Sequence, residues 1–255
     1  FVTLVEFNDI AALERALAAR DIACVLTEPV LTNTGMVLPE PGFLDALPKV
    51  TRETGTLLIM DETHTLSSGP GGYCRAHGLQ PDGIVLGKPI AGGIPAAAYG
   101  FSAHAAARIR TFLETRLGGR SGIGTTLSGS KIQLALMRSM LETCFTKETF
   151  APLIALAEKL EHGISALIAK HKVPWHVVRV GARVEFMCVP ERPKNGSEAA
   201  RAIHKPVDMA VHHYLLNRGV VITPFHNMML ICPATTAAHV ERLLSGLDQC
   251  LAELA

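Results

Sequence analysis

LLIMDETHTLSSGPGGY, residues 57–73, carries a short apolar run, LLIM, directly into an acidic pair, Asp61 and Glu62. An apolar run of this length, bounded by turn-forming residues, is typical of a buried strand. A carboxylate at the end of such a strand lies close to the core, where its charge is costly unless a cation or a hydrogen-bond donor meets it. The stretch therefore predicts a strand that ends at Asp61, and a partner for Asp61 in the protein or in a ligand.

Helical and strand patterns alternate on both sides of this strand. The expected elements are a strand in residues 1–9, a helix at 9–20 capped by Asp9, a strand at 23–30, a helix at 41–55 stopped by Gly55, and strands at 83–88 and 96–102. Strands that alternate with helices favour an α/β fold with a mostly parallel sheet covered on both faces.

The pattern changes after about residue 130. The expected elements are helices at 131–144 and 150–171, a strand hairpin at 175–190, a polar loop at 190–202, a helix at 207–219, a strand at 228–233 and a helix from Thr236. No linker rich in Pro or Ser separates the two patterns. We therefore expect a larger α/β domain at 1–150 and a smaller α+β domain at 151–255, with the boundary inside a long helix.

Two opposite charges lie at strand ends, Asp61 after LLIM and Lys88 after IVLG. In open α/β sheets ligands bind at the carboxyl ends of the strands, so both side chains are expected on one rim. A partly buried lysine there can act as a nucleophile, and a carboxylate can keep a pyridine nitrogen protonated, which together fit pyridoxal phosphate. An exposed lysine in a turn, or an ordinary ion pair between Asp61 and Lys88, is the alternative.

Four segments then resemble a known family in their order and approximate spacing. They are VLTEPVLTNTGMVLPEPGFLDAL (25–47), GTLLIMDETHT (55–65), PDGIVLGKPIAGGIPAAAYG (81–100) and GTTLSGS (124–130). Together they resemble the class III pyridoxal-phosphate-dependent aminotransferases, and most of all the branch similar to glutamate-1-semialdehyde aminomutase. The resemblance implies the large domain of fold type I, a smaller C-terminal domain, and a homodimer that transfers amino groups.

The resemblance also implies roles for particular residues. Asp61 corresponds to the aspartate that pairs with the pyridine nitrogen, and Lys88 to the lysine that holds the cofactor as an internal aldimine. Thr63 falls where the family places a small side chain against the ring. Thr126 corresponds to the threonine that reaches the phosphate of the cofactor in the other subunit.

Three further positions carry weaker implications. His64 stands where many members have a glutamine that bonds the ring hydroxyl, a hydrogen bond that an imidazole could also donate, with a packing role as the alternative. Asn33 is kept as in the semialdehyde branch, which implies a place near the cofactor. Glu28 either opposes an arginine of the substrate site or simply ends its strand.

The segment at 229–232 lacks the arginine with which many transaminases of this class bind an α-carboxylate. Arg179 and Arg183 could bind a carboxylate instead, but we expect both at the surface. A β-amino acid, a semialdehyde or an amine is therefore a better substrate candidate than a standard α-amino acid.

The family has a large segment before the position of Phe1, including the turn that binds the phosphate, so we expect the chain to be a fragment. A truncated or degenerate relative that serves as a dimerisation or binding module is the alternative function. A Rossmann-type nucleotide enzyme is a third, but GGIP and GPGGY do not give its glycine fingerprint.

The composition of the chain bears on its partners, metal sites and location. Lys and Arg total 24 against 23 for Asp and Glu, and we find no basic run interleaved with aromatics, so nucleic acid is not an expected partner. The six cysteines are scattered without metal-ligand spacing, which favours reduced thiols, a cytoplasmic location and no metal site. No apolar run is long enough to cross a membrane.

Overall fold

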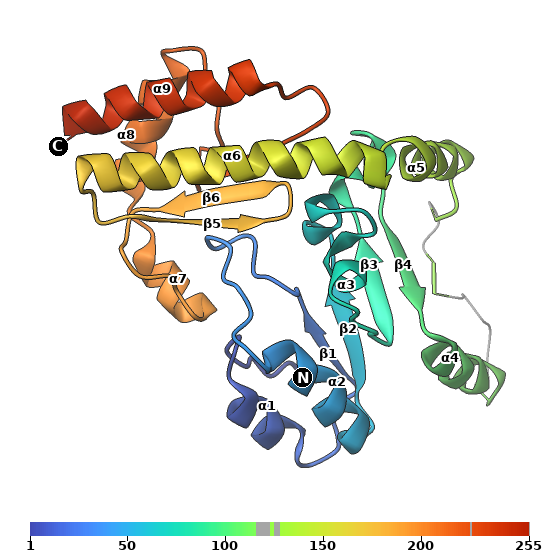
Figure 1. Ribbon diagram of the computed structural model, residues 1–255. Coiled ribbons are helices and arrows are strands. Elements are labelled where there is room, and N and C mark those ends of the chain that lie inside the picture. The colour runs from blue at the N-terminus through green and yellow to red at the C-terminus, as the bar shows by residue number, and fades with distance from the viewer. Residues whose placement is uncertain (116–122, 125–127, 225, 255) are drawn as a thin grey trace.

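The computed structural model describes residues 1–255 except 116–122, 125–127, 225 and 255 (Figure 1). The described chain contains two β-sheets, helices and two short 3₁₀ turns, η1 and η2. In chain order the elements are α1 (Ile10–Leu17), β1 (Cys24–Thr27), α2 (Phe43–Thr54), β2 (Leu57–Asp61), η1 (Thr65–Ser68), α3 (Gly72–Ala76), β3 (Gly83–Leu86), η2 (Lys88–Ala91), β4 (Ala98–Phe101), α4 (Ala103–Thr115), α5 (Lys131–Thr143), α6 (Lys147–His171), β5 (His176–Val180), β6 (Arg183–Met187), α7 (Gly196–Ala202), α8 (Lys205–Leu216), β7 (Met228–Leu230) and α9 (Ala237–Leu254).

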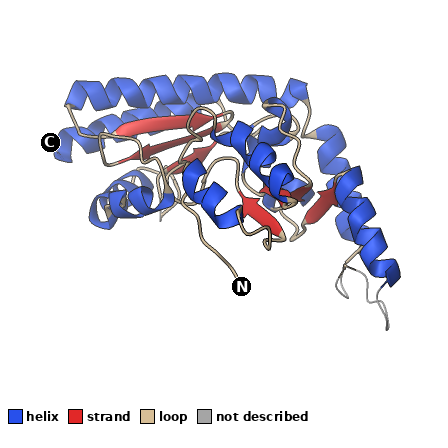
Figure 2. Cartoon of the chain, turned by 90° about the horizontal axis from the view of Figure 1, so that it is seen from below, coloured by secondary structure: helices blue, strands red, loops and turns tan. Residues whose placement is uncertain are grey.

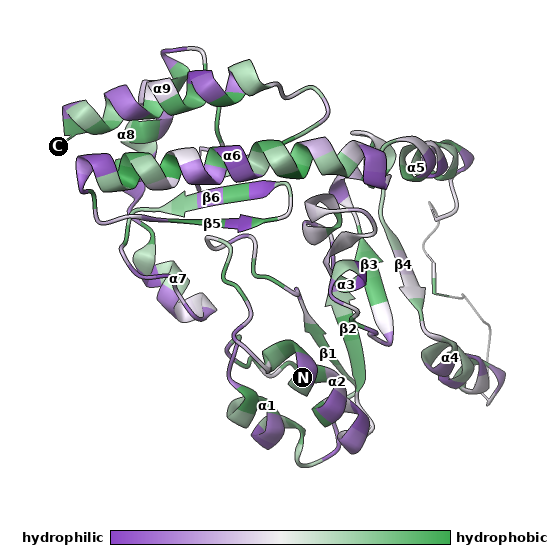
Figure 3. Ribbon diagram, viewed as in Figure 1, coloured by the Kyte–Doolittle hydropathy of each residue, from purple (hydrophilic) through white to green (hydrophobic). Residues whose placement is uncertain are grey.

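The first sheet has the order β1-β2-β3-β4, with β1, β2 and β3 parallel and β4 antiparallel to β3. This confirms the mostly parallel sheet expected from the sequence. Leu58 and Met60 of β2 are buried with residues of α1 and α2, including Leu17 and Leu47. Hydrophobic residues concentrate on β2 and β3 (Figure 3). Because β2 and β3 are parallel neighbours, their carboxyl ends lie side by side.

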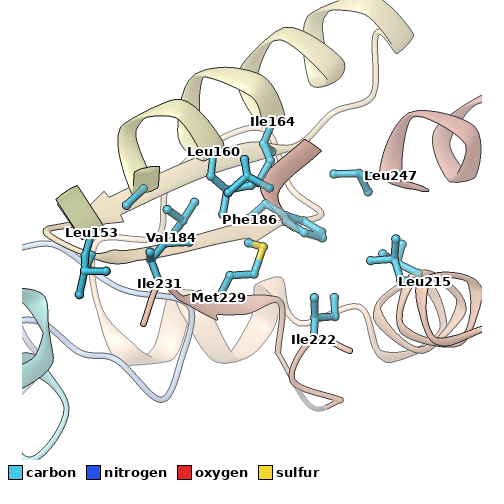
Figure 4. Close-up of a cluster of buried hydrophobic side chains, with 14 of the residues drawn as sticks. Leu153, Leu160, Ile164, Val184, Phe186, Leu215, Ile222, Met229, Ile231 and Leu247 are labelled. Atoms are coloured by element: carbon cyan, nitrogen blue, oxygen red, sulfur yellow. The ribbon is translucent and has the colours of Figure 1, made fainter. Parts of the chain in front are cut away.

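The second sheet has the order β5-β6-β7 and is antiparallel throughout, as the expected hairpin requires. Helix α6 lies along this sheet, and α9 packs beside α6 (Figures 1 and 2). Side chains from these helices and strands meet in a buried cluster that includes Leu160, Phe186 and Leu247 (Figure 4). The buried members of this cluster fall between residues 150 and 251.

The tip of the β5–β6 hairpin joins the second sheet to the first. Ala182 N donates to Ser68 O over 3.0 Å. Gly181 adopts φ 57°, and a Cβ placed there would lie 1.6 Å from Ser68 O, so only glycine permits this approach. Val178 and Val180 of β5 are buried in one cluster with Tyr73, which extends the contact.

Two expectations about local structure are wrong. Residues 1–9 form no strand in the structure, because Phe1, Val2 and Leu4 stay exposed and no described strand pairs with them. The expected loop at 190–202 contains α7, whose first turn is capped reciprocally: Asn195 Oδ1 accepts from Glu198 N, and Glu198 Oε2 accepts from Lys194 N.

Within the described residues, no helix has both the length and the apolar character needed to cross a membrane.

Candidate active site at the ends of β2 and β3

Asp61 lies at the last position of β2, opposite Val85 of β3, and is half-buried. Thr63 N donates to Asp61 Oδ1 over 2.8 Å, which fixes the carboxylate in the turn that follows the strand. The Thr63 side chain lies against Gly87, where an added Cβ would be 3.2 Å from Thr63 Cγ2. Asp61 and Thr63 are thus held at the rim where β3 also ends.

Lys88 follows β3 and opens η2 with an exposed side chain. Its backbone has φ 46°, in the left-handed region that residues other than glycine seldom adopt. Strain of this kind is maintained only where the surrounding structure enforces it, and it is concentrated at functional sites. Asn8, Arg20, Met36 and Lys172 share this conformation, so the backbone of Lys88 supports a functional role only together with its position after β3.

The charges around Lys88 act in opposite directions on its amine. Partial burial, and then the Arg183 guanidinium, lower the pKa of Lys88 below its ordinary value, while the carboxylates of Glu28 and Asp61 raise it. The lowering effects prevail. A larger fraction of the Lys88 amine is therefore unprotonated near neutral pH than in an ordinary lysine, as a nucleophile requires.

His64 contacts Lys88 directly. Its Nε2 meets Lys88 Nζ, and its Nδ1 meets the hydroxyl of Thr32, which in turn donates to Glu28 Oε2 over 2.5 Å. Thr32 and His64 are buried. Glu28, which follows β1, accepts hydrogen bonds from both the hydroxyl and the backbone amide of Thr32, and its charge also acts on the Arg183 guanidinium.

The ordinary ion pair between Asp61 and Lys88 is not formed. Among the described residues, the salt bridges do not include one that joins these two side chains. The rim therefore presents a carboxylate and an amine that are near each other and not paired.

Arg183 corrects an expectation, because it was expected at the surface and is only 3% exposed. It donates from Nη2 to Ser67 Oγ over 2.8 Å and from Nε to His64 O over 3.1 Å. Burial lowers its pKa to about 10, with Glu185 and Glu28 opposing that shift. Arg179 is half-buried and pairs with Glu161 on α6 over 2.7 Å.

One expected site residue lies elsewhere, and another is outside the described residues. Asn33 is exposed and borders a separate cavity of about 30 Å³ with Glu185 and Asp208. Thr126 lies outside the described residues. A larger cavity of about 490 Å³ borders β7 and α9 and includes none of the residues expected at the site.

No pattern in the sequence predicts the contacts among Glu28, Thr32 and His64. Glu28 and Thr32 are separated by only four positions, but the chain between them is a loop without a periodic pattern, and His64 follows 32 positions later. Only the parallel pairing of β1 with β2 brings the loops after these strands together.

Comparison with known proteins gives a consistent assignment. The family model described as aminotransferase class-III matches residues 4–251. The chain is 32% identical to glutamate-1-semialdehyde 2,1-aminomutase 1 of Bacillus cereus (strain G9842), over 98% of this chain and 58% of that protein. It is also 32% identical to glutamate-1-semialdehyde 2,1-aminomutase of Anaeromyxobacter sp. (strain Fw109-5), over 98% of this chain and 57% of that protein.

Solved structures agree. The fold matches a glutamate-1-semialdehyde-aminomutase from Pseudomonas aeruginosa PAO1 in complex with PMP, with a TM-score of 0.94 and 49% identity, over 99% of this chain and 57% of that one. A beta-phenylalanine aminotransferase from Variovorax paradoxus shares the fold, with a TM-score of 0.86 and 24% identity, over 98% of this chain and 57% of that one.

The chain spans a little more than half the length of these relatives. The match of the family model nevertheless covers nearly the whole chain, including both sheets and the rim that carries Asp61 and Lys88. The chain belongs to the class III aminotransferase family.

Proposed function

We propose that this chain is part of a pyridoxal-phosphate-dependent enzyme that transfers amino groups, as an aminotransferase or an aminomutase. The observation that carries the proposal is Lys88: its backbone is strained, its pKa is lowered, and it ends the strand next to the one that ends at Asp61. The alternative of a non-catalytic dimerisation or binding module is not favoured, because it gives no reason to keep an amine and a carboxylate on one rim without a salt bridge between them.

The residues at the rim fit this cofactor. When bound, pyridoxal phosphate supplies an aldehyde that condenses with amines and a ring that withdraws electrons from the adjacent carbon. The Lys88 amine would bind the aldehyde carbon, the Asp61 carboxylate would hold a proton on the ring nitrogen, and Thr63 would pack against the ring. In turnover the free Lys88 amine would carry a proton to and from the reacting carbon. His64 touches Lys88 and would lie at the edge of the same site.

The proposed substrate class follows from the positions of the arginines that could bind a substrate carboxylate. Strand β7 and the residues after it, 228–232, contain no arginine. Arg183 is buried against the loop of His64, and Arg179 pairs with α6. We therefore propose a β-amino acid, a semialdehyde or an amine as the substrate class.

We also propose that the active form is a homodimer to which Thr126 contributes across the interface. Large hydrophobic side chains are exposed on β4, α4 and α5, among them Tyr99 at 51%, Phe112 at 61% and Ile132 at 69%. These elements lie together on one side of the molecule (Figure 1), which is the kind of surface that a second copy would cover.

The domain division proposed is 1–150 and 151–255. The buried cluster under the second sheet takes its members from residues 150–251, which supports a boundary at the start of α6. A cytoplasmic location is proposed as well, and it is supported by six cysteines without a disulfide.

The proposal is tested by treating the purified protein with pyridoxal phosphate, reducing it with borohydride, and measuring intact and peptide masses. We expect one stable adduct on Lys88 and none in Lys88→Ala. Lys172→Ala is the matched control, because Lys172 also has a left-handed backbone, with φ 54°, but ends α6. An unmodified Lys88, or an adduct that survives in Lys88→Ala, would contradict the proposal.

A further inference from the structure

A line of polar contacts leads from Lys88 into the protein. Lys88 Nζ meets His64 Nε2, His64 Nδ1 meets Thr32 Oγ1, and the Thr32 hydroxyl donates to Glu28 Oε2 over 2.5 Å. The two inner members are nearly inaccessible, with Thr32 at 0% and His64 at 8% exposure. Water therefore cannot readily replace the contact between His64 Nδ1 and Thr32.

The hydrogens available on these groups determine which atom donates and which accepts in each contact. The Thr32 hydroxyl has one hydrogen, and donating it to the Glu28 carboxylate leaves Thr32 Oγ1 as an acceptor toward His64. His64 Nδ1 must then carry the proton, and Nε2 of the neutral ring is left as an acceptor. From the other end, a protonated lysine offers only donors, so it also requires an acceptor at Nε2. Both ends select the same tautomer.

We propose that Glu28 is a positioning residue which acts through Thr32 to hold His64 as the Nδ1–H tautomer, so that Nε2 accepts a hydrogen bond from the Lys88 amine. This inference rests on the proposed function, in which Lys88 must lose a proton before its amine can react. The proton moves from Lys88 Nζ to His64 Nε2, leaving a neutral amine and an imidazolium. The positive charge that the ring gains is balanced through Thr32 by the Glu28 carboxylate.

The other charged groups around the line are compatible with this assignment. Asp61 and Glu28 bring negative charge to Lys88, and Arg183 brings positive charge from β6. Arg183 touches His64 only at the backbone oxygen, through Nε, so it does not compete for either ring nitrogen. Burial raises the pKa of Glu28, whereas the two hydrogen bonds from Thr32 lower it, so breaking those bonds favours the protonated carboxyl. Thr32 therefore helps to keep Glu28 as the carboxylate that accepts the hydrogen of the Thr32 hydroxyl.

The experiment is to label the histidines of the purified chain with ¹⁵N and to read the tautomer of His64 from long-range ¹H–¹⁵N spectra, without added cofactor. The signal is assigned by its loss in His64→Asn. In the unmodified chain we expect well-separated shifts for a protonated Nδ1 and an unprotonated Nε2. In Lys88→Met, which removes the donor at Nε2, the separation should persist. Adding Thr32→Val to that variant should collapse the separation to that of a mixture of tautomers, whereas adding Thr32→Ser should leave it intact.

Thr34→Val is the matched control. Thr34 lies in the same loop, and its hydroxyl is buried without a hydrogen-bond partner in the described part of the chain, so the same substitution there should leave the His64 shifts unchanged. Glu28→Leu, which removes the acceptor for the Thr32 hydroxyl, provides a second variant if Thr32→Val fails to fold, and in the Lys88→Met chain it should also abolish the single tautomer.

An Nε2–H tautomer in the unmodified chain, or a Lys88→Met spectrum that Thr32→Val leaves unchanged, would overturn the proposal. Because no cofactor is present, these outcomes are independent of the borohydride test: a chain that forms no adduct at Lys88 can still show the tautomer, and a chain that forms the adduct can still lack it.

Discussion

Arg183 places a guanidinium inside the protein, where it donates to Ser67 Oγ and His64 O. Its positive charge lowers the pKa of Lys88, so Arg183→Gln should raise that pKa and move the labelling of Lys88 by an acylating reagent to higher pH. The rate of labelling of Lys88 as a function of pH, followed by peptide mass, measures this. Arg179→Gln on the same hairpin should leave the profile unchanged, and an unchanged profile for Arg183→Gln would contradict the prediction.

The same substitution should also destabilise the fold. Removing the guanidinium takes both of its donors away from the Ser67 hydroxyl, at a cost of about 1–3 kcal/mol for a buried group left unsatisfied, while the His64 carbonyl still accepts from Ser67 Oγ. Urea unfolding of Arg183→Gln should therefore show a lower midpoint than that of Arg179→Gln, whose salt bridge is partly exposed. Equal midpoints for the two variants would show that the buried hydrogen bonds contribute little.

At the scale of residues, the sequence predicts where a side chain lies in the fold better than it predicts which other side chains it contacts. Asp61 and Lys88 could be placed on one rim, because strand ends in a parallel sheet meet at one edge. Arg183 was misplaced, since residue type suggests the surface, whereas every residue of the central strand β6 is buried. The link from His64 through Thr32 to Glu28 depends on how two loops meet, which no local pattern encodes.

The hairpin of β5 and β6 is the element that fixes the second sheet against the loop of His64. Gly181→Ala should disrupt it, because the new methyl group would overlap Ser68 O and the backbone has φ 57°. Overpacking of this kind costs about 1–3 kcal/mol, and the left-handed conformation adds about 1–2 kcal/mol. Thermal or urea unfolding measures the loss.

Gly78→Ala separates the two contributions. Gly78 has φ 66° but an added Cβ meets nothing within 4 Å, so this variant should carry only the conformational cost. If both variants lose the same stability, the close approach of the hairpin tip to Ser68 has no energetic weight.

At the scale of elements, helices were predicted well where caps are explicit. Asp9 accepts from Ala12 N at the start of α1, and Gly55 ends α2 in the left-handed conformation, as expected. Helix α7 was missed although Asn195 and Glu198 have the spacing of a reciprocal cap, because the surrounding Pro, Lys and Gly favour a loop. Residues 1–9 show the opposite error, since a strand pattern needs a neighbouring strand to form.

The whole molecule exposes a surface that a second copy is proposed to cover. Sedimentation or light scattering should give twice the 27.3 kDa mass of the chain, and Ile132→Glu should shift the mass toward the monomer by placing a charge in the interface. Leu216→Glu, at a similarly apolar exposed position on α8, should leave the mass unchanged. A monomeric unmodified chain would contradict the dimer.

The overall architecture was largely predictable, since the alternation of short apolar runs with helical stretches specifies a parallel sheet, and the later hairpin specifies a second one. The contact between the two sheets was not predictable. It rests on Gly181 and Arg183 meeting Ser68 and Ser67, and neither end of that contact has a sequence signal for the other.

The bonds from Arg183 to the loop of His64 also have a consequence for the order of synthesis. Arg183 follows Ser67 by 116 residues, so at about 5–20 residues per second the ribosome completes it roughly 6–23 s later. For most of that interval the nascent chain carries both Asp61 and Lys88, while the loop between them lacks the arginine that holds it in place. A polypeptide released before residue 183 would therefore contain the reactive groups without the element that holds them in register.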